Sequence, residues 1–271
     1  MNKYFAMPLK QRLLSVLVTR KQLEEWRASW KVFFILAHGR SGTNFLANLL
    51  DQSQGAHVFH EPVVEDFSAY LKAFHDVKNA DKYIQGFRKR EIYLRMRHIP
   101  AGVYGEVNGM LRRHAAAIRN AFPAVTLIHL VRDGRDVVRS TMSRKMVQIK
   151  NFYSMGIYPG KLDPWRARWK DMDRFSRVCW LWQEENALLR KEINRTVQFE
   201  QILSGYEYFC NEILEPCQVF LDKKVWEAAV TSPRNITSSF EMPKWKDWTP
   251  AQQKTFREIC GDEMEKCGYQ F

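Results

Sequence analysis

The stretch KVFFILAHGRSGTNFLANLLDQSQGAHVFHEP, residues 31–62, decides the fold. Its residues 32–37 are apolar, rich in β-branched and aromatic types, and followed by Gly39, which is typical of a buried strand in a parallel sheet. From Thr43 onward the apolar residues recur at helical spacing: Phe45, Leu46, Leu49 and Leu50. The order strand, tight turn, helix therefore predicts the first unit of an α/β domain.

The turn between strand and helix, residues 38–43, has the composition of an anion-binding loop. It holds two glycines, two hydroxyl side chains and the fixed positive charge of Arg40, immediately before a helix N-terminus. Glycines let the backbone approach an anion closely, and the unpaired N–H groups and the dipole of the helix favour negative charge. The lysine of GxxxxGK[ST] is missing, because Thr43 follows Gly42, so a kinase that clamps a γ-phosphate fits poorly.

A second short strand is predicted at residues 56–59, and His60-Glu61-Pro62 follows it directly. In a doubly wound sheet both strand ends open on the same edge, where ligands bind. We therefore expect Glu61 to face the turn.

The positive net charge of the chain indicates either an anionic partner or charge spread over the surface for solubility. The chain has 271 residues, 45% of them hydrophobic, a net charge of +12 and a pI near 9.5. This length suffices for one large domain with an ample core. A basic run with interleaved aromatic residues at 87–98 resembles the composition of a single-strand nucleic-acid groove. We expect instead a helical insertion whose basic side is solvated or lines an acceptor cleft.

Three further strands are expected at residues 104–108, 124–131 and 196–199. Helices are expected at 111–122, over 163–190 with an apolar tryptophan-rich stripe, and from Thr249-Pro250 to Cys267. The prediction is a single α/β domain over 1–271, with a P-loop-like central parallel sheet of four to five strands flanked by helices. The segment at about 63–100 is expected as a helical insertion on the acceptor side.

A second anion site is predicted after the strand at 124–131. Arg132 stands at the strand end, and Ser140 and Arg144, four residues apart, would share one helical face. All three could hold one phosphate. A nucleotide with phosphates at two separated positions explains two such sites better than an ordinary triphosphate does.

These two stretches resemble motifs of the sulfotransferases that use 3′-phosphoadenosine 5′-phosphosulfate (PAPS). Residues 39–46, GRSGTNFL, resemble the family's 5′-phosphosulfate loop, and residues 130–140, LVRDGRDVVRS, resemble its 3′-phosphate motif. The closest likeness is to the tyrosylprotein and carbohydrate branches, which share Arg-Ser-Gly where cytosolic aryl enzymes carry Lys. Weaker similarities lie at residues 199–203, FEQIL, and 243–245, PKW.

The resemblance implies transfer of a sulfuryl group from PAPS to a hydroxyl acceptor, with adenosine 3′,5′-bisphosphate (PAP) as product and no metal. It implies Glu61 as the general base and Arg40 as the group that stabilises the transferring sulfonate. The implied PAPS-binding residues are Arg40, Ser41, Gly42, Thr43 and Asn44 for the 5′-phosphosulfate, Arg132, Ser140 and Arg144 for the 3′-phosphate, and Ser238 and Lys244 in addition.

The departures from the family pattern bear on acceptor and location. All five cysteines lie from Cys179 onward, so the disulfide pattern of the tyrosylprotein branch cannot form. We therefore expect a carbohydrate, lipid or small-molecule acceptor and a cytoplasmic, bacterial enzyme. No run approaches the roughly 18 apolar residues that cross a bilayer. The basic, amphipathic N-terminal segment is expected to pack on the sheet, with contact to a membrane surface as the alternative.

Two alternative functions stay open at this point. One is a P-loop nucleotide or small-molecule kinase, against which the missing lysine argues. The other is a non-enzymatic protein that binds nucleic acid or a sulfated polymer through the basic run at 87–98. The ordered pair of anion sites argues against it, and since no base-reading motif is present, we expect no nucleic-acid partner.

Overall fold

One five-stranded parallel sheet forms the centre of the computed structural model, which describes residues 15–144, 148–232 and 242–271. Its order is β2-β3-β1-β4-β5, and β1 pairs with both β3 and β4. The α/β class with a parallel sheet of four to five strands is thereby confirmed. The strands are β1 (Lys31–Ala37), β2 (Ala56–His60), β3 (Val103–Asn108), β4 (Thr126–Val131) and β5 (Thr196–Gln198).

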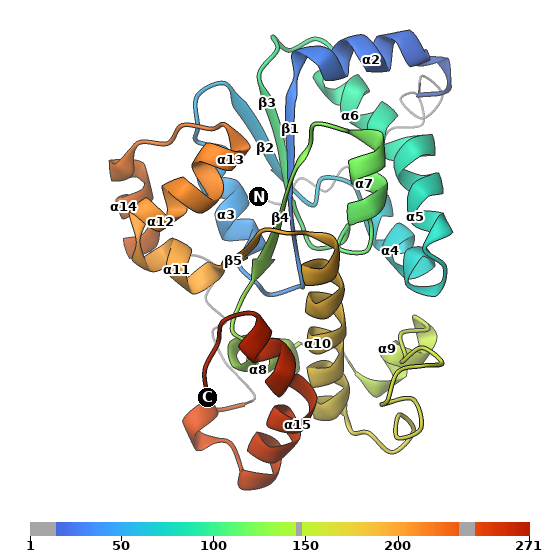
Figure 1. Ribbon diagram of the computed structural model, residues 1–271, viewed down its shortest axis with the longest axis vertical. Helices are drawn as coiled ribbons and strands as arrows, with labels where there is room; N and C mark the ends of the chain where they lie inside the picture. Colours follow the sequence, from blue (N-terminus) through green and yellow to red (C-terminus); the bar gives the residue numbers. More distant parts are fainter. Residues whose placement is uncertain (1–14, 145–147, 233–241) are drawn as a thin grey trace.

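Helices cover both faces of the sheet (Figure 1). One face carries α3 (Thr43–Leu50), α11 (Phe199–Ser204), α12 (Tyr206–Phe209), the π-helix η2 (Cys210–Leu214), α13 (Glu215–Cys217) and α14 (Lys223–Thr231). The other carries α4 (Glu65–His75), α5 (Lys78–Tyr83), the π-helix η1 (Ile84–Arg88), α6 (Lys89–Met96) and α7 (Ala115–Ala121). The helix α2 (Arg20–Ser29) lies at the amino ends of the strands.

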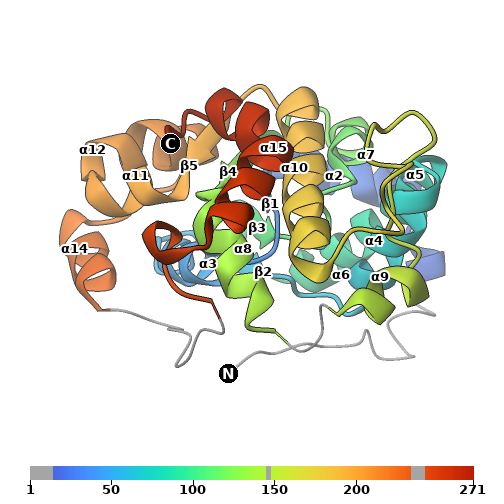
Figure 2. The same cartoon turned by 90° about the horizontal axis from the view of Figure 1, so that it is seen from below.

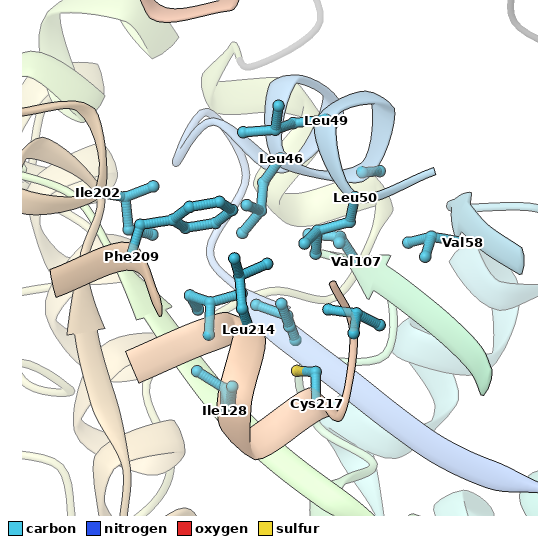
Figure 3. Close-up of a cluster of buried hydrophobic side chains, with 14 of the residues drawn as sticks. Leu46, Leu49, Leu50, Val58, Val107, Ile128, Ile202, Phe209, Leu214 and Cys217 are labelled. Carbon is cyan, nitrogen blue, oxygen red and sulfur yellow. The ribbon is translucent and has the colours of Figure 1, made fainter. Parts of the chain in front are cut away.

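Alternation along β1 divides its side chains between two hydrophobic cores. Phe33, Ile35 and Ala37 belong to the core beneath α3, whose members include Leu46, Leu49 and Leu214 (Figure 3). The intervening Val32, Phe34 and Leu36 belong to the core on the opposite face. Because successive strand residues point to opposite faces, a nearly continuous apolar strand is what burial on both sides requires.

A third core lies beyond the carboxyl ends of the strands. There α8 (Gly134–Met142), α10 (Arg174–Glu192) and α15 (Pro250–Lys266) pack together, as Figure 2 shows from below. This core buries Trp180, Trp182 and Phe256 completely. The helix α9 (Ile149–Ser154) and the 3₁₀ turn η3 (Trp245–Asp247) adjoin this core. It fixes the position of α8, which carries Ser140 of the second predicted anion site.

The long helix predicted over 163–190 is wrong in its first third. The helix begins at Arg174, because the Asp173 side chain accepts a hydrogen bond from Ser176 N and caps it. The preceding residues form turns whose carbonyls at Trp169 and Met172 accept bonds from the buried Arg177. The helix predicted over 111–122 is likewise shorter, whereas Thr249 caps α15 as predicted.

The basic run at 87–98 does not form a uniformly solvated face. Arg88 is only 1% exposed and lies among three buried carboxylates. Its Nε lies 2.9 Å from Asp66 Oδ1, its Nη2 lies 2.5 Å from Glu106 Oε1, and it also pairs with Glu91. The burial of one cation by several carboxylates is a tertiary arrangement that the local pattern could not indicate. It joins α4, α6 and β3 across the face of the sheet.

The amphipathic helix expected near the N-terminus is described in part. In α2, Leu23 and Trp26 are buried, whereas residues 1–14 lie outside the described residues. Among the residues that the structure describes, no helix combines the length and apolar character needed to span a membrane.

Replacing Arg88 with alanine should lower the free energy of unfolding by about 3–5 kcal/mol, because Asp66, Glu91 and Glu106 would stay buried without their cation. Urea denaturation followed by circular dichroism measures the loss. The control is Arg97→Ala, since Arg97 is an exposed cation of the same basic run and should change stability by no more than about 0.5 kcal/mol. Equal stability of the two variants would contradict this account of the buried cluster.

Candidate active site

The two predicted anion sites meet at one edge of the sheet. The strands β1 and β4 are neighbours, with Ala37 opposite Leu130, so the turns that follow them lie side by side. Arg132 Nη1 donates a hydrogen bond to the carbonyl oxygen of Arg40 at 3.3 Å, and Arg40 Nε donates to Ser140 Oγ at 3.0 Å. Three predicted PAPS-binding residues from two distant segments thus form one hydrogen-bonded group.

Positive charge is concentrated around Arg40. Burial lowers the pKa of its guanidinium, and the nearby charges of Arg144 and Arg132 lower it further. Such like-charge crowding is costly in a partly buried place. A bound anion would relieve the repulsion, so the electrostatics of this edge favour an anionic ligand.

The turn itself offers several hydrogen-bond donors. Gly42 is the N-cap of α3, and no side chain caps the N–H groups that follow it. The Ser41 hydroxyl is fully buried and has no hydrogen-bond partner among the described residues. Buried hydroxyls are nearly always paired, so an unpaired one beside a free helix N-terminus marks a place for a ligand acceptor.

Gly42 is required at its position for two physical reasons. Its φ of 87° lies in the left-handed region that favours glycine, and a Cβ there would meet the Phe199 ring at 2.2 Å. The ring of Phe199 also packs edge-on against Phe45. The first residue of α11 therefore occupies the space that a side chain at position 42 would need.

Glu61 lies beside Gly109, which itself lies close to the first glycine of the turn. Its Oε1 accepts a hydrogen bond from Gly109 N at 3.2 Å, and the residue is 9% exposed. A Cβ built on Gly109 would lie 3.0 Å from Glu61 Oε1 and 4.0 Å from Gly39 N. The carboxylate and the turn therefore flank the same point, as the order of the strands led us to expect.

Backbone strain coincides with the two residues predicted to be catalytic. Arg40 has a φ of 72° and Glu61 a φ of 43°, and in the part of the chain that the structure describes Gln218 is the one further non-glycine residue with positive φ. Left-handed conformations cost non-glycine residues free energy and cluster at functional sites. No feature of the sequence indicated this strain.

His60 connects the turn to Glu61. Its Nε2 lies 2.9 Å from Thr43 Oγ1, its Nδ1 lies 3.4 Å from Asn44 Nδ2, and its Nε2 lies 4.0 Å from Glu61 Oε1. Burial lowers the pKa of His60, which favours the neutral ring. The predicted residues Thr43 and Asn44 are therefore held from the side of the second strand.

Two supports of Arg132 escaped the sequence analysis. Asp136 Oδ2 lies 3.3 Å and Glu200 Oε1 lies 3.9 Å from its guanidinium nitrogens. The side chain also stands over the ring of Phe199, 5.6 Å from the centroid. Glu200 belongs to the FEQIL stretch at 199–203, so the resemblance was a signal for it, whereas no pattern in the sequence indicated the contact with Asp136.

A buried ionic network, which the sequence did not suggest, supports the site from below. Glu185 pairs with Arg112 at 3.4 Å and with Arg113 at 3.1 Å, and it accepts a hydrogen bond from Tyr70 OH at 2.8 Å. Arg112 also donates to the carbonyl of Gly109, the residue whose N–H bonds Glu61. The network therefore supports the segment that holds Glu61.

Three predicted residues remain, and the structure does not place them inside the candidate site. Arg144 is exposed and follows the end of α8, so it does not share a helical face with Ser140, although its charge acts on Arg40. Lys244 is exposed just before η3, and no contact with Arg40 or Arg132 is seen in the described segments. Ser238 lies outside the described residues.

A family model described as the sulfotransferase family matches residues 33–222, which include both turns, most of β1 and the whole of β2 to β5. The chain belongs to the sulfotransferase family. No match was found among curated proteins.

The fold of this sulfotransferase is similar to that of solved family members. The sulfotransferase domain from the curacin biosynthetic pathway aligns with a TM-score of 0.52 at 12% identity, covering 89% of this chain and 99% of that one. The sulfotransferase STF9 from Mycobacterium avium aligns with a TM-score of 0.50 at 12% identity, covering 100% of this chain and 88% of that one. At such identity the likeness shows the fold alone.

The stability of this enzyme should fall in mild acid because of His38, the first residue of the turn. Burial lowers the pKa of its imidazole to about 4, and the charge of Arg112 lowers it further. Since the unfolded chain binds this proton near pH 6.5, the contribution of His38 is complete above that pH and is lost as the pH falls toward 4. Between pH 7 and 5 the loss of unfolding free energy that His38 causes amounts to about 2 kcal/mol.

Urea denaturation of the native protein and His38→Asn at both pH values isolates this contribution. The difference between the two proteins is the relevant quantity, because burial raises the pKa of Asp66 to about 6 and gives its contribution the opposite pH dependence. The variant should lose less stability than the native protein on going from pH 7 to 5. Equal losses would show that His38 takes up its proton equally well in the folded state.

Proposed function

We propose that this sulfotransferase transfers the sulfuryl group of PAPS to the hydroxyl of a carbohydrate, lipid or small molecule. The observation that carries the proposal is the group formed by Arg132, Arg40 and Ser140 at adjacent strand ends. A donor with a phosphate at each end of its ribose fits two neighbouring cationic turns better than a linear triphosphate does. Family membership supports the sulfuryl chemistry.

The residues of the first turn fit a 5′-phosphosulfate. An anion could accept hydrogen bonds from the uncapped N–H groups at the start of α3 and from the unpaired Ser41 hydroxyl. The guanidinium of Arg40 adds a positive charge at the same place. Thr43 and Asn44 would complete this end of the site. At the other end Arg132, Ser140 and Arg144 would hold the 3′-phosphate, with Lys244 and Ser238 as further contributors.

The chemistry assigned to the chain's own residues is proton acceptance and charge stabilisation. Bound PAPS would supply an activated sulfuryl group. The carboxylate of Glu61 would accept the proton of the incoming hydroxyl, since Gly109 N holds it beside the turn. The guanidinium of Arg40 would stabilise the negative charge that develops on the sulfonate and on the leaving phosphate. In this proposal side chains and backbone supply the positive charge, so we expect a metal-independent reaction.

Calorimetry with PAP, ATP and ATP plus Mg²⁺ tests the donor. The enzyme should bind PAP without metal and more tightly than ATP. Arg132→Ala should weaken PAP binding by about ten- to one-hundred-fold, because one charge-assisted contact to phosphate is lost.

The matched control is Arg195→Ala, because Arg195 precedes β5 and its guanidinium pairs with Glu212. It removes the same charge and should leave PAP affinity unchanged. Tighter binding of ATP that needs Mg²⁺ would favour a kinase instead, and an unaffected affinity in Arg132→Ala would remove the second turn from the site.

Glu61→Gln tests the base. The change keeps shape and an oxygen that can accept from Gly109 N, so PAP affinity should persist while turnover drops by about 10²–10⁴-fold. Turnover is measured with the first acceptor that gains one SO₃ group in a mass-spectrometric screen across phenols, glycans and lipid alcohols.

Glu207→Gln serves as the control, because Glu207 is an exposed carboxylate on α12. It should have native turnover. A Glu61→Gln enzyme as fast as this control would exclude Glu61 as the general base.

A further inference from the structure

A second cationic cavity lies at the other end of the molecule. It measures about 390 Å³ and is lined by residues of α2, the start of α6 and the end of α7. The helix α2 precedes the first residue of β1, whereas Arg40 follows the last, so the length of the strand, roughly 20 Å, separates the cavity from the candidate active site. Figure 1 shows α2 and α8 at opposite ends of the sheet.

The cavity carries an excess of positive charge. Arg20, Arg27, Lys89 and Arg90 line it together with one carboxylate, Glu24, which Arg20 Nε bonds at 2.7 Å. Four cations and one anion leave a net charge of +3. Burial lowers the pKa of Lys89, and the charges of Arg90, Arg27 and Arg20 lower it further, which reports their mutual proximity.

Two buried donors of the cavity wall have no partner. Trp26 is 6% exposed, and its indole Nε1 lacks a hydrogen-bond partner in the described part of the chain. The Nε of Arg90 is buried and unpaired in the same way. Leu23 and Phe122 give the wall an apolar part.

We propose that this cavity binds a small amphipathic ester of phosphate or sulfate. Its charged group would lie among Arg27, Lys89 and Arg90, and its apolar or aromatic part would lie against Trp26 and Leu23. The volume falls within the roughly 300–1,000 Å³ of small-molecule sites. The ester could be free in solution or form the head of a lipid, and the site does not depend on the identity of the sulfuryl donor.

Calorimetry with 1-naphthyl phosphate, inorganic phosphate and 1-naphthol tests the site. We expect 1-naphthyl phosphate to bind most tightly, because it alone combines the ring with the dianion. The double variant Lys89→Gln/Arg90→Gln should weaken binding by at least about ten-fold. Since the bonds of these side chains run to Gln85 and Gly86 within the same helical stretch, the variant should fold.

Two control proteins separate this site from general charge and from the candidate active site. Lys78→Gln/Lys82→Gln removes the same charge from exposed positions of α5 and should bind as the native protein does. Arg132→Ala should bind equally well. The absence of binding to the native protein, an equal loss in the α5 control, or a loss confined to Arg132→Ala would each overturn the proposal.

Vesicles identify the source of the ester. Sedimentation with phosphatidylcholine vesicles, with and without phosphatidic acid, is compared between the native protein and the Lys89/Arg90 variant. Binding that needs phosphatidic acid and both cations assigns the site to a lipid head. Binding of 1-naphthyl phosphate without binding to vesicles assigns it to a free ester.

Discussion

Repulsion among Arg40, Arg132 and Arg144 is the constraint on which the candidate active site depends. Neighbouring parallel strands deliver the first two side chains to the same edge, and partial burial strengthens their mutual effect, as the lowered pKa of Arg40 reflects. A chain pays such a cost only where the surrounding structure holds the cations in place. Here a hydrogen bond to Ser140 orients one of them, and carboxylates of Asp136 and Glu200 orient another.

The rigidity that opposes this repulsion comes from elements far from the turns in sequence. The tryptophan-rich core of α8, α10 and α15 fixes Ser140, and the buried network around Glu185 reaches the segment of Gly109. Positive φ values at Arg40 and Glu61 persist because both sides of each residue are held. The two proposed catalytic groups thus lie on backbone that tertiary contacts hold in a strained conformation.

The sequence predicts those parts of this arrangement that are local. Apolar periodicity and the glycine positions at 31–50 predict β1, the turn and α3, and the capping residues Thr249 and Pro250 predict the start of α15. The bond between Arg40 and Ser140 spans 100 residues, and no local pattern encodes it. The helix expected from residue 163 begins only at Arg174 for a related reason. Tryptophans in the preceding turns have the same spacing as the apolar stripe of the helix, so the pattern alone does not show where the helix starts. Burial of Arg88 was missed since its three carboxylates come from separate elements.

The ring of Phe199 contacts both turns at once, filling the space beside Gly42 while the guanidinium of Arg132 stands over it. Residues that share one volume cannot vary independently. Among relatives of this enzyme, the size of the side chain at the position of Phe199 should therefore covary with the residue at the second glycine of the turn. A change at the second glycine of the turn would then be matched by a change at the first residue of α11, which begins at Phe199.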